Sequence, residues 1–210
     1  MKKLEPTYLR YVYDSLGSGL LSSDNSSSLP HGFVGLFEAN FSEDITSSKR
    51  LSLLRRFTMW SLFKCAISSS MASEIIEEDE EDTKAFIDTY SKWFNSPEPG
   101  KYILYHDRLR TYFLQKLSSH EVQSLNEKLV SYLEAALEDS RADEAQEYAL
   151  EHLATHMVVE SQLGNNYDRL HDFVNNEELW SRQLKVSKEY KWSQQSVQHG
   201  RKKEQGVIMR

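Results

Sequence analysis

Residues 101–117 constrain the fold of this chain more than any other stretch. They begin with a run at 102–105 that favours a β-strand and follows a Pro-Glu-Pro-Gly turn. They continue with apolar residues at the i, i+4, i+5, i+8 spacing of one helix face, at Leu109, Phe113, Leu114 and Leu117. The stretch therefore predicts a strand that leads directly into an amphipathic helix.

Two polar residues, His106 and Asp107, lie between the predicted strand and helix. We expect Asp107 to cap the first turn, and His106 to lie where free backbone N–H groups and the helix dipole collect. A helix N-terminus suits an anion, so His106 could meet a phosphate group. Physical reasoning alone leaves a second interpretation open, in which His106 satisfies a polar group at the strand–helix junction.

The segments before this junction complete a winged-helix pattern over residues 45–117. Helices are predicted at 48–63, 71–78 and 82–93, because apolar residues recur there every three or four positions. A strand at 92–94 would pair with the strand at 102–105 across the Pro/Gly turn, as a two-stranded wing. Helices and a β-hairpin in this order predict a winged-helix domain.

Charge argues against a DNA-reading role for this domain. The second short helix would open with six consecutive acids at 77–82, which a DNA backbone repels, and Lys84 is the first basic residue after them. The chain as a whole carries a net charge of −7 and has an isoelectric point near 5.5, so no nucleic-acid partner is expected. We interpret the acids as a solvated turn and helix N-terminus.

Further helices are expected on both sides of the winged helix, so the fold class is mainly α. Residues 1–44 would form a small helical unit, with helices near 4–16 and 33–41 separated by a polar loop. Residues 118–200 would continue as antiparallel helices, which begin with a capping box at Ser118 and suggest the start of an α-solenoid. Residues 201–210 lack apolar periodicity and are expected to form a disordered tail.

The remaining composition points to an ordinary intracellular protein. The single cysteine, Cys65, excludes an internal disulfide, fits a reducing compartment and is expected to pack in the core rather than act as a nucleophile. No apolar run approaches the about 18 residues that a membrane span needs. Residues 1–3 are not followed by the apolar stretch of a secretory leader. We therefore expect a cytoplasmic protein with no membrane partner.

The strand–helix junction resembles a known motif. His106 and Asp107, followed by Arg-Leu-Arg, are similar to the MHD motif of STAND ATPases, the NACHT and NB-ARC signalling switches, with Tyr105 in place of methionine. Pro6 lies in a Leu-Glu-Pro-Thr-Tyr-Leu run that resembles another family segment, although Leu4 stands where the family has glycine. A third segment, at 148–157, is similar to the family pattern Y-x-L-x-H-L-x-x-H-L.

The resemblance implies a regulatory function. In the family the motif histidine touches the β-phosphate of bound ADP and holds the inactive form closed, which implies His106 and Asp107 as cofactor-binding residues. The family proline packs near the adenine, which implies Pro6 as a third. The implied function is that of a regulatory fragment of a STAND-type signalling ATPase, which couples nucleotide state to a C-terminal sensor and contacts other proteins through its helical region.

The sequence contains no phosphate-binding loop of the form G-x-x-x-x-G-K-[ST]. The chain by itself is therefore not expected to be an enzyme or to hold a cofactor. ADP or ATP would bind in the context of a full-length protein, where a P-loop nucleotide-binding domain is supplied in cis or in trans. The alternative function is a stand-alone helical scaffold for protein–protein interaction, with no nucleotide role.

A metal site at His152 and His156 is a further alternative. These residues lie four positions apart, which places them on one helix face and would suit a metal ion. The zinc-protease pattern needs a glutamate directly after the first histidine, and this chain has Leu153 there. We therefore expect packing hydrogen bonds between helices, and no metal.

Overall fold

The structure is a computed structural model that describes residues 47–139, 143–164 and 167–187, together with Tyr13 and Gly35. The chain divides into two compact units, residues 1–53 and 54–210. Pro6, most of the helices expected at 4–16 and 33–41, and the tail at 201–210 lie outside the described residues. The expectation of a mainly helical chain with a small antiparallel sheet is confirmed for the part of the chain that the structure describes.

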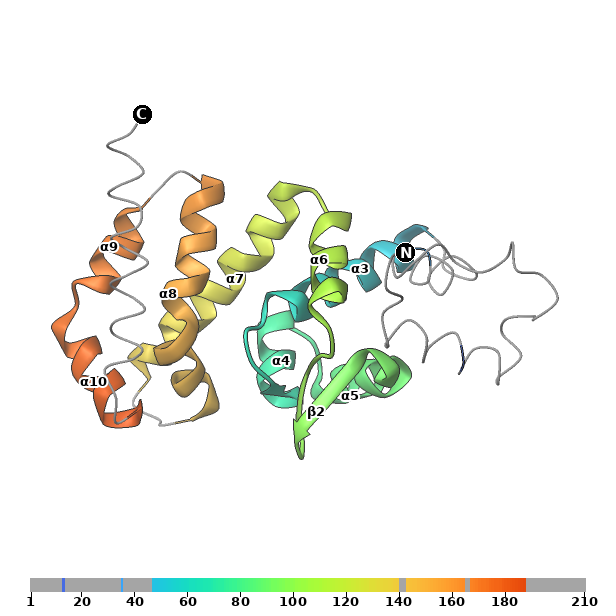
Figure 1. The fold of residues 1–210 in the computed structure, drawn as a ribbon, viewed down its shortest axis with the longest axis horizontal. Coiled ribbons are helices and arrows are strands. Elements are labelled where there is room, and N and C mark those ends of the chain that lie inside the picture. Colours follow the sequence, from blue (N-terminus) through green and yellow to red (C-terminus); the bar gives the residue numbers. More distant parts are fainter. Residues whose placement is uncertain (1–12, 14–34, 36–46, 140–142, 165–166, 188–210) are drawn as a thin grey trace, which may run out of the picture. The chain divides into compact units, whose positions relative to one another are not determined.

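The sheet and the helices around it come first along the described chain (Figure 1). Helix α3 is followed by a two-residue strand, two short helices, a 3₁₀ turn, a β-hairpin and helix α6. The bounds are α3 Ser47–Leu62, β1 Ile67–Ser68, α4 Ser69–Ile76, α5 Glu80–Thr89, η2 Ser91–Trp93, β2 Phe94–Glu98, β3 Lys101–Leu104 and α6 Asp107–Lys116.

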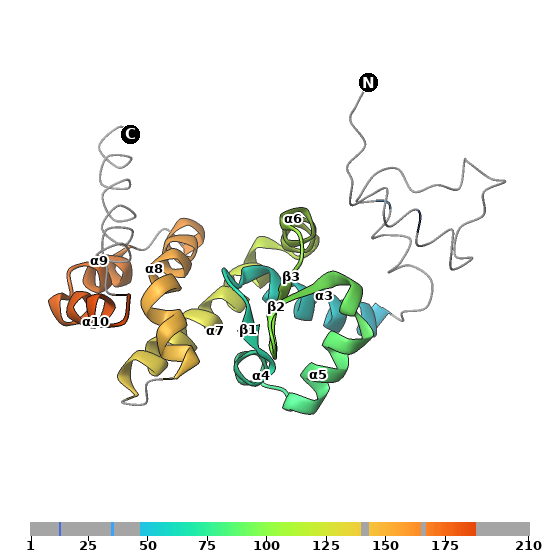
Figure 2. The same ribbon diagram turned by 60° about the horizontal axis from the view of Figure 1, so that its bottom comes forward.

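The sheet has three antiparallel strands in the order β1-β3-β2 (Figure 2). Ile67 pairs with Tyr102, and Phe94 pairs with Leu104. The prediction of a two-stranded wing was therefore wrong, because a third strand of only two residues joins it, and so short a strand leaves no periodic pattern in the sequence. Gly100 turns the hairpin with a φ of +77°, a conformation that favours glycine.

The predicted partner strand at 92–94 was also wrong in its bounds. Lys92 and Trp93 belong to the 3₁₀ turn η2, and the strand runs from Phe94 to Glu98 instead. It includes Pro97, which the sequence pattern assigned to the turn. A proline is tolerated there because β2 is an edge strand, where a missing N–H does not break the sheet.

An aromatic core joins α3 to the elements that follow it. The rings of Phe57 and Phe113 stack with centroids 4.4 Å apart, and the ring of Phe86 lies 4.9 Å from that of Phe57. The hydroxyl of Thr58 donates a hydrogen bond to the carbonyl of Phe113 at 3.2 Å. Helix α6 is thus fixed against α3 by both apolar packing and a buried hydrogen bond.

The second group of described elements is entirely helical, with α7 Ser119–Glu138, α8 Glu144–Gly164, α9 Asp168–Val174 and α10 Glu177–Ser187. The predicted capping box at the start of α7 is confirmed, because Ser118 and Glu121 exchange hydrogen bonds between side chain and backbone. The buried residues of α8 include Ala145, Ala149, Leu153 and Met157, which lie at the spacing of one helix face. None of the described helices is both long and apolar enough to cross a membrane.

Candidate functional site

The junction between β3 and α6 places His106 at the N-cap of the helix. Its backbone is extended, with φ −146° and ψ 135°, and its Nδ1 accepts a hydrogen bond from the backbone N–H of Arg108 at 3.1 Å. The expectation that Asp107 caps the helix was wrong, because Asp107 is already the first helical residue. The imidazole reaches the N–H two residues ahead and takes the role that aspartate usually has at this position.

This hydrogen bond fixes the tautomer of a neutral His106 ring. Because Nδ1 uses its lone pair to accept from Arg108, the ring proton lies on Nε2. The ring is half-buried, and Tyr105 lies edge-on to it with centroids 5.9 Å apart. Tyr105 is itself placed by Trp93, whose carbonyl accepts its backbone N–H at 3.1 Å. The neutral imidazole therefore has a defined orientation and presents an N–H donor.

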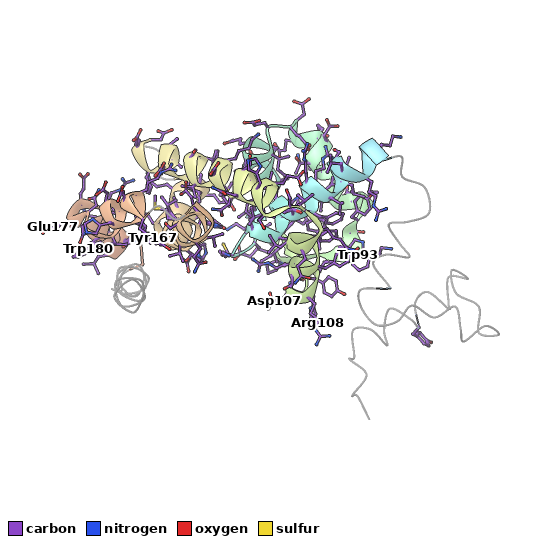
Figure 3. The ribbon with its side chains drawn as sticks, turned by 90° about the horizontal axis from the view of Figure 1, so that it is seen from above. Trp93, Asp107, Arg108, Tyr167, Glu177 and Trp180 are labelled. Atoms are coloured by element: carbon purple, nitrogen blue, oxygen red, sulfur yellow. The ribbon has the colours of Figure 1, made fainter. Side chains whose placement is uncertain are left out.

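The other charged residues of the motif differ in their surroundings. Asp107 and Arg108 point away from the packed side chains (Figure 3), and the Asp107 side chain is 95% exposed. Arg110 turns the other way, and its guanidinium lies 3.7 Å from the Asp107 carboxylate with only 18% of the side chain exposed. One acid and two cations thus surround the first turn of α6, so the local charge does not oppose an anion.

Arg110 connects this turn to the end of α3. Its Nε donates to the carbonyl of Ser61 at 3.2 Å, and its Nη2 donates to the carbonyl of Phe63. Both carbonyls lie at the C-terminal end of α3, where helical carbonyls lack partners within the helix. The sequence analysis missed Arg110, although it is the last residue of the Arg-Leu-Arg triplet that follows the motif.

The two histidines of α8 have different polar surroundings. His156 is fully buried, and its Nε2 lies 3.0 Å from the hydroxyl of Tyr148. The Nε2 of His152 is buried without a hydrogen-bond partner, and the ring of Tyr148 lies 4.8 Å from the His152 ring. No group of three or more metal-binding side chains occurs among the residues that the structure describes. The predicted packing hydrogen bonds are confirmed for His156.

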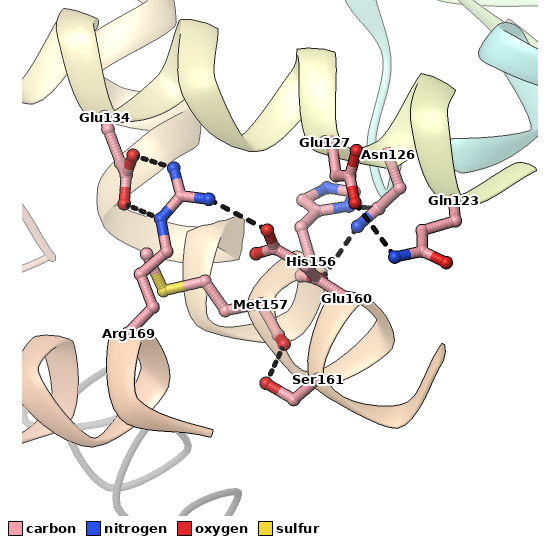
Figure 4. A network of polar contacts seen from close by, with 9 residues as sticks. All are labelled: Gln123, Asn126, Glu127, Glu134, His156, Met157, Glu160, Ser161 and Arg169. Carbon is pink, nitrogen blue, oxygen red and sulfur yellow. Dashed lines mark hydrogen bonds and ion pairs between the residues drawn. The ribbon is translucent and has the colours of Figure 1, made fainter. Parts of the chain in front are cut away.

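His156 lies in a buried network whose proton positions are determined (Figure 4). The amide nitrogen of Asn126 donates to the carbonyl of His156 at 3.0 Å, so the amide oxygen faces Nδ1 of the ring at 3.3 Å. Nδ1 must therefore carry the ring proton, and Nε2 accepts from the Tyr148 hydroxyl. The Tyr148 oxygen in turn accepts the backbone N–H of Lys64 at 3.0 Å.

Burial disfavours the charged form of both of these histidines. It lowers the pKa of His156 well below the ordinary value, and the nearby Lys64 acts in the same direction. It lowers the pKa of His152 to about 4 for the same reasons. Burial also raises the pKa of the Tyr148 hydroxyl. The network is thus an uncharged structural element, and sequence analysis could have found it only from Asn126, a polar residue within the apolar face of α7.

A second polar network holds α9 to the preceding helices (Figure 4). The guanidinium of Arg169 donates to both carboxylate oxygens of Glu134 in α7, and to Glu160 in α8 at 2.8 Å. A two-pronged pair of this kind fixes orientation as well as distance. Because Arg169 ties both glutamates to α9 and so joins three helices, we assign the network a structural role.

Cys65 and the acidic run carry no catalytic signal. Burial raises the pKa of the Cys65 thiol to about 11, with a further contribution from Glu151, so the thiolate is disfavoured. Among the acids at 77–82, Glu78 pairs with Arg56 and Glu77 pairs with Lys128. Several of these charges are therefore compensated within the chain, which fits a solvated turn and helix start.

A hollow of about 490 Å³ lies on α4 and α7, and none of its lining residues belongs to α6. Three of the lining residues are acidic, Glu74, Glu77 and Glu127. Lys128 and Tyr132 contribute from α7, and the Tyr132 hydroxyl donates to Glu74 at 2.7 Å. The hollow thus has a mixed lining and is separate from the first turn of α6.

Comparisons of the chain with protein-family models, with curated proteins and with solved structures find no match. Of the three residues expected to bind a nucleotide, His106 and Asp107 are neighbours in this turn, and Pro6 lies outside the described residues.

Proposed function

We propose that this chain is a regulatory part of a STAND-type signalling ATPase. In this proposal residues 45–117 act as a winged helix, residues 118–200 begin an α-solenoid that leads to a sensor, and His106 contacts the β-phosphate of ADP. The nucleotide is held mainly by a P-loop domain that this sequence does not contain, in cis or in trans. The chain acts in the cytoplasm and has no enzymatic activity of its own.

The geometry of His106 is the observation that carries this proposal. Its Nδ1 accepts the Arg108 N–H, so the proton of the neutral ring is on Nε2, and a contact between this N–H and an anion would leave the cap in place. The first turn of a ten-residue helix adds the positive end of its dipole. Asp107 then acts as a dipole-compensating acid and as a partner of Arg110, and not as the cap.

The order of elements supports the same proposal. A helix, a short strand, two helices and a hairpin precede α6, and the short strand β1 pairs with β3 of the hairpin. This is the arrangement expected of a winged helix, and the motif lies where the hairpin leads into the next helix. The acids at the start of α5 disfavour DNA as the partner of such a domain.

Two substitutions at His106 separate the phosphate contact from the cap. Asparagine is a good N-cap residue and keeps an acceptor for the Arg108 N–H, but it lacks the ring Nε2–H. Alanine lacks both. The wild-type chain, His106→Asn and His106→Ala would each be combined with the P-loop domain of a STAND protein, and ADP dissociation would be measured.

We expect His106→Asn to weaken ADP binding by a factor of about 5 to 150, as the loss of a hydrogen bond of about 1–3 kcal/mol to a charged phosphate predicts. Its melting temperature should stay close to that of the wild type. If His106→Asn binds ADP as tightly as the wild-type chain, the histidine is a cap only and the proposal fails. The chain alone should neither retain ADP on purification nor hydrolyse ATP.

The second candidate function is a helical scaffold for protein–protein interaction without a nucleotide role. The hollow on α4 and α7 favours it, because a concave surface lined by three acids and Lys128 could hold a segment of another protein. If charge-reversing Glu127→Lys abolishes binding of such a partner while His106→Asn leaves ADP binding unchanged, the scaffold function replaces the switch function.

A further inference from the structure

The C-terminal end of α3 is completed by groups from two other helices. The last turn of α3 contains no basic residue that could compensate the negative end of the helix dipole. Arg110 of α6 supplies this charge, because it donates to the carbonyls of both Ser61 and Phe63. The guanidinium is mostly buried at this point, so the contacts are stronger than they would be at the surface.

The next backbone group along the chain is bound by a different helix. The N–H of Lys64 donates to the hydroxyl of Tyr148 in α8 at 3.0 Å. Tyr148 is 4% exposed, and its own proton goes to His156, which is tied to Asn126 of α7. Residues 61–64 therefore accept hydrogen bonds from α6 and donate one to α8.

We infer that residues 61–64 form a joint that couples the first turn of α6 to α8, with Arg110 and Tyr148 as its two positioning residues. The bound groups lie within four consecutive residues and each is held by a hydrogen bond, so a shift of this backbone towards one helix changes its distance from the other. A displacement of α6 is thus transmitted through Arg110 to the backbone, and through Lys64 N–H to Tyr148. The joint itself is a statement about this chain, and only the nature of the signal rests on the proposed function.

Amide hydrogen exchange in the 210-residue chain tests the joint without any nucleotide. Tyr148→Phe removes the acceptor of the Lys64 N–H and keeps the ring. Tyr132→Phe is the matched control, because it removes a hydroxyl that bonds Glu74 at 2.7 Å between α7 and α4, away from the joint. Exchange is followed at Lys64 and at Leu109 and Arg110, whose N–H groups donate to the carbonyl of His106. The fully buried Leu133 in α7 reports global opening.

We expect Tyr148→Phe to accelerate exchange at Lys64 by about fivefold or more, as the loss of one hydrogen bond predicts. Leu109 and Arg110 should also accelerate, and by more than Leu133. Arg110→Met should accelerate exchange at Lys64 in the same way. In the double variant, the acceleration at Lys64 should be smaller than the product of the two single-variant accelerations. Once one of the two hydrogen-bonded contacts is removed, the other no longer couples the two helices. Tyr132→Phe should leave all three amides unchanged relative to Leu133.

Acceleration confined to Lys64 would overturn the joint, and so would equal acceleration at Leu109, Arg110 and Leu133. A double variant whose acceleration at Lys64 equals the product of the two single-variant accelerations would also overturn it. This outcome is independent of ADP binding by His106→Asn. If the exchange pattern holds and His106→Asn binds ADP normally, the joint stands and the proposed function fails. If His106→Asn loses ADP and the exchange pattern is absent, the proposed function stands and the joint fails.

Discussion

The first turn of α6 and the middle of α8 each contain a histidine from a segment that resembles the same family, and the two rings have opposite tautomers. His106 accepts through Nδ1 and carries its proton on Nε2, whereas His156 donates through Nδ1 and accepts through Nε2. His106 is half-buried at a helix start, and His156 is fully buried between helices. The comparison teaches that surroundings, and not motif similarity, decide whether a histidine holds the fold or can meet a ligand.

The largest expected effect is on stability, from His156→Ala. The substitution leaves a cavity and removes the partners of Asn126 and Tyr148, which should cost about 2–5 kcal/mol of the free energy of unfolding. The melting temperature should fall by about 2–4 °C for each kcal/mol. Thermal unfolding of His156→Ala and His106→Ala side by side checks this. If His106→Ala is the more destabilising of the two, the comparison is reversed.

The next largest effect is a loss of stability at acidic pH, which arises from His152 and His156 in α8. Burial lowers the pKa of His152 to about 4 and holds that of His156 well below its ordinary value, so the unfolded chain binds more protons than the folded one below about pH 6.5. The contribution of neutral histidine is therefore complete above pH 6.5 and is lost as the pH falls towards 4. Each group steepens the dependence by up to about 1.4 kcal/mol per pH unit.

Thermal unfolding between pH 7 and pH 4 tests this origin of the acid sensitivity. In His152→Gln, the melting temperature should change less over this range than in the wild-type chain. His120→Gln is the control, because His120 is exposed in the first turn of α7. Equal pH dependence in His152→Gln and in the wild-type chain would show that the acid sensitivity has another source.

A smaller effect is expected for the cap of α6. His106→Ala should cost about 1 kcal/mol of the free energy of unfolding, as the loss of an N-cap does, and His106→Asn should restore most of it. Chemical denaturation of the three proteins gives the comparison. Equal stability of His106→Ala and the wild type would mean that the Nδ1 contact contributes nothing.

The smallest effect belongs to the neighbour of His106. Asp107→Ala should change the free energy of unfolding by less than about 0.5 kcal/mol, because the side chain is exposed and its partner Arg110 is 3.7 Å away. The same denaturation series measures it. A cost above that of His106→Ala would make Asp107 the effective cap, as the sequence alone had suggested.

The sequence predicted the longer helices well and the junctions poorly. Helix α3 and the start of α7 were found because apolar periodicity and a capping box are local patterns. Strand β1 was missed because it is two residues long and is defined by its pairing with β3. Asp107 was preferred as the cap because aspartate is the commoner residue there, whereas the orientation of the His106 ring depends on Tyr105 and Trp93.

Only part of the candidate site could likewise be predicted from the sequence. His106 could be placed at a helix start by the strand and helix patterns on either side of it. The roles of Arg110 and Tyr148 could not be predicted in this way, since their partners are backbone groups 47 and 84 residues away in the chain. Contacts of that range carry no periodic signal, and a single sequence does not contain them.

The central claim, that His106 holds its helix with one ring nitrogen and presents the other as a donor, is tested most directly by ¹⁵N NMR of the histidine rings in the 210-residue chain. At a pH where the rings are neutral, the account predicts that His106 carries its proton on Nε2 and that His156 carries its proton on Nδ1. His106→Asn and His156→Ala assign the two signals. A proton on Nδ1 of neutral His106 would contradict the account, because the ring could then not accept from Arg108.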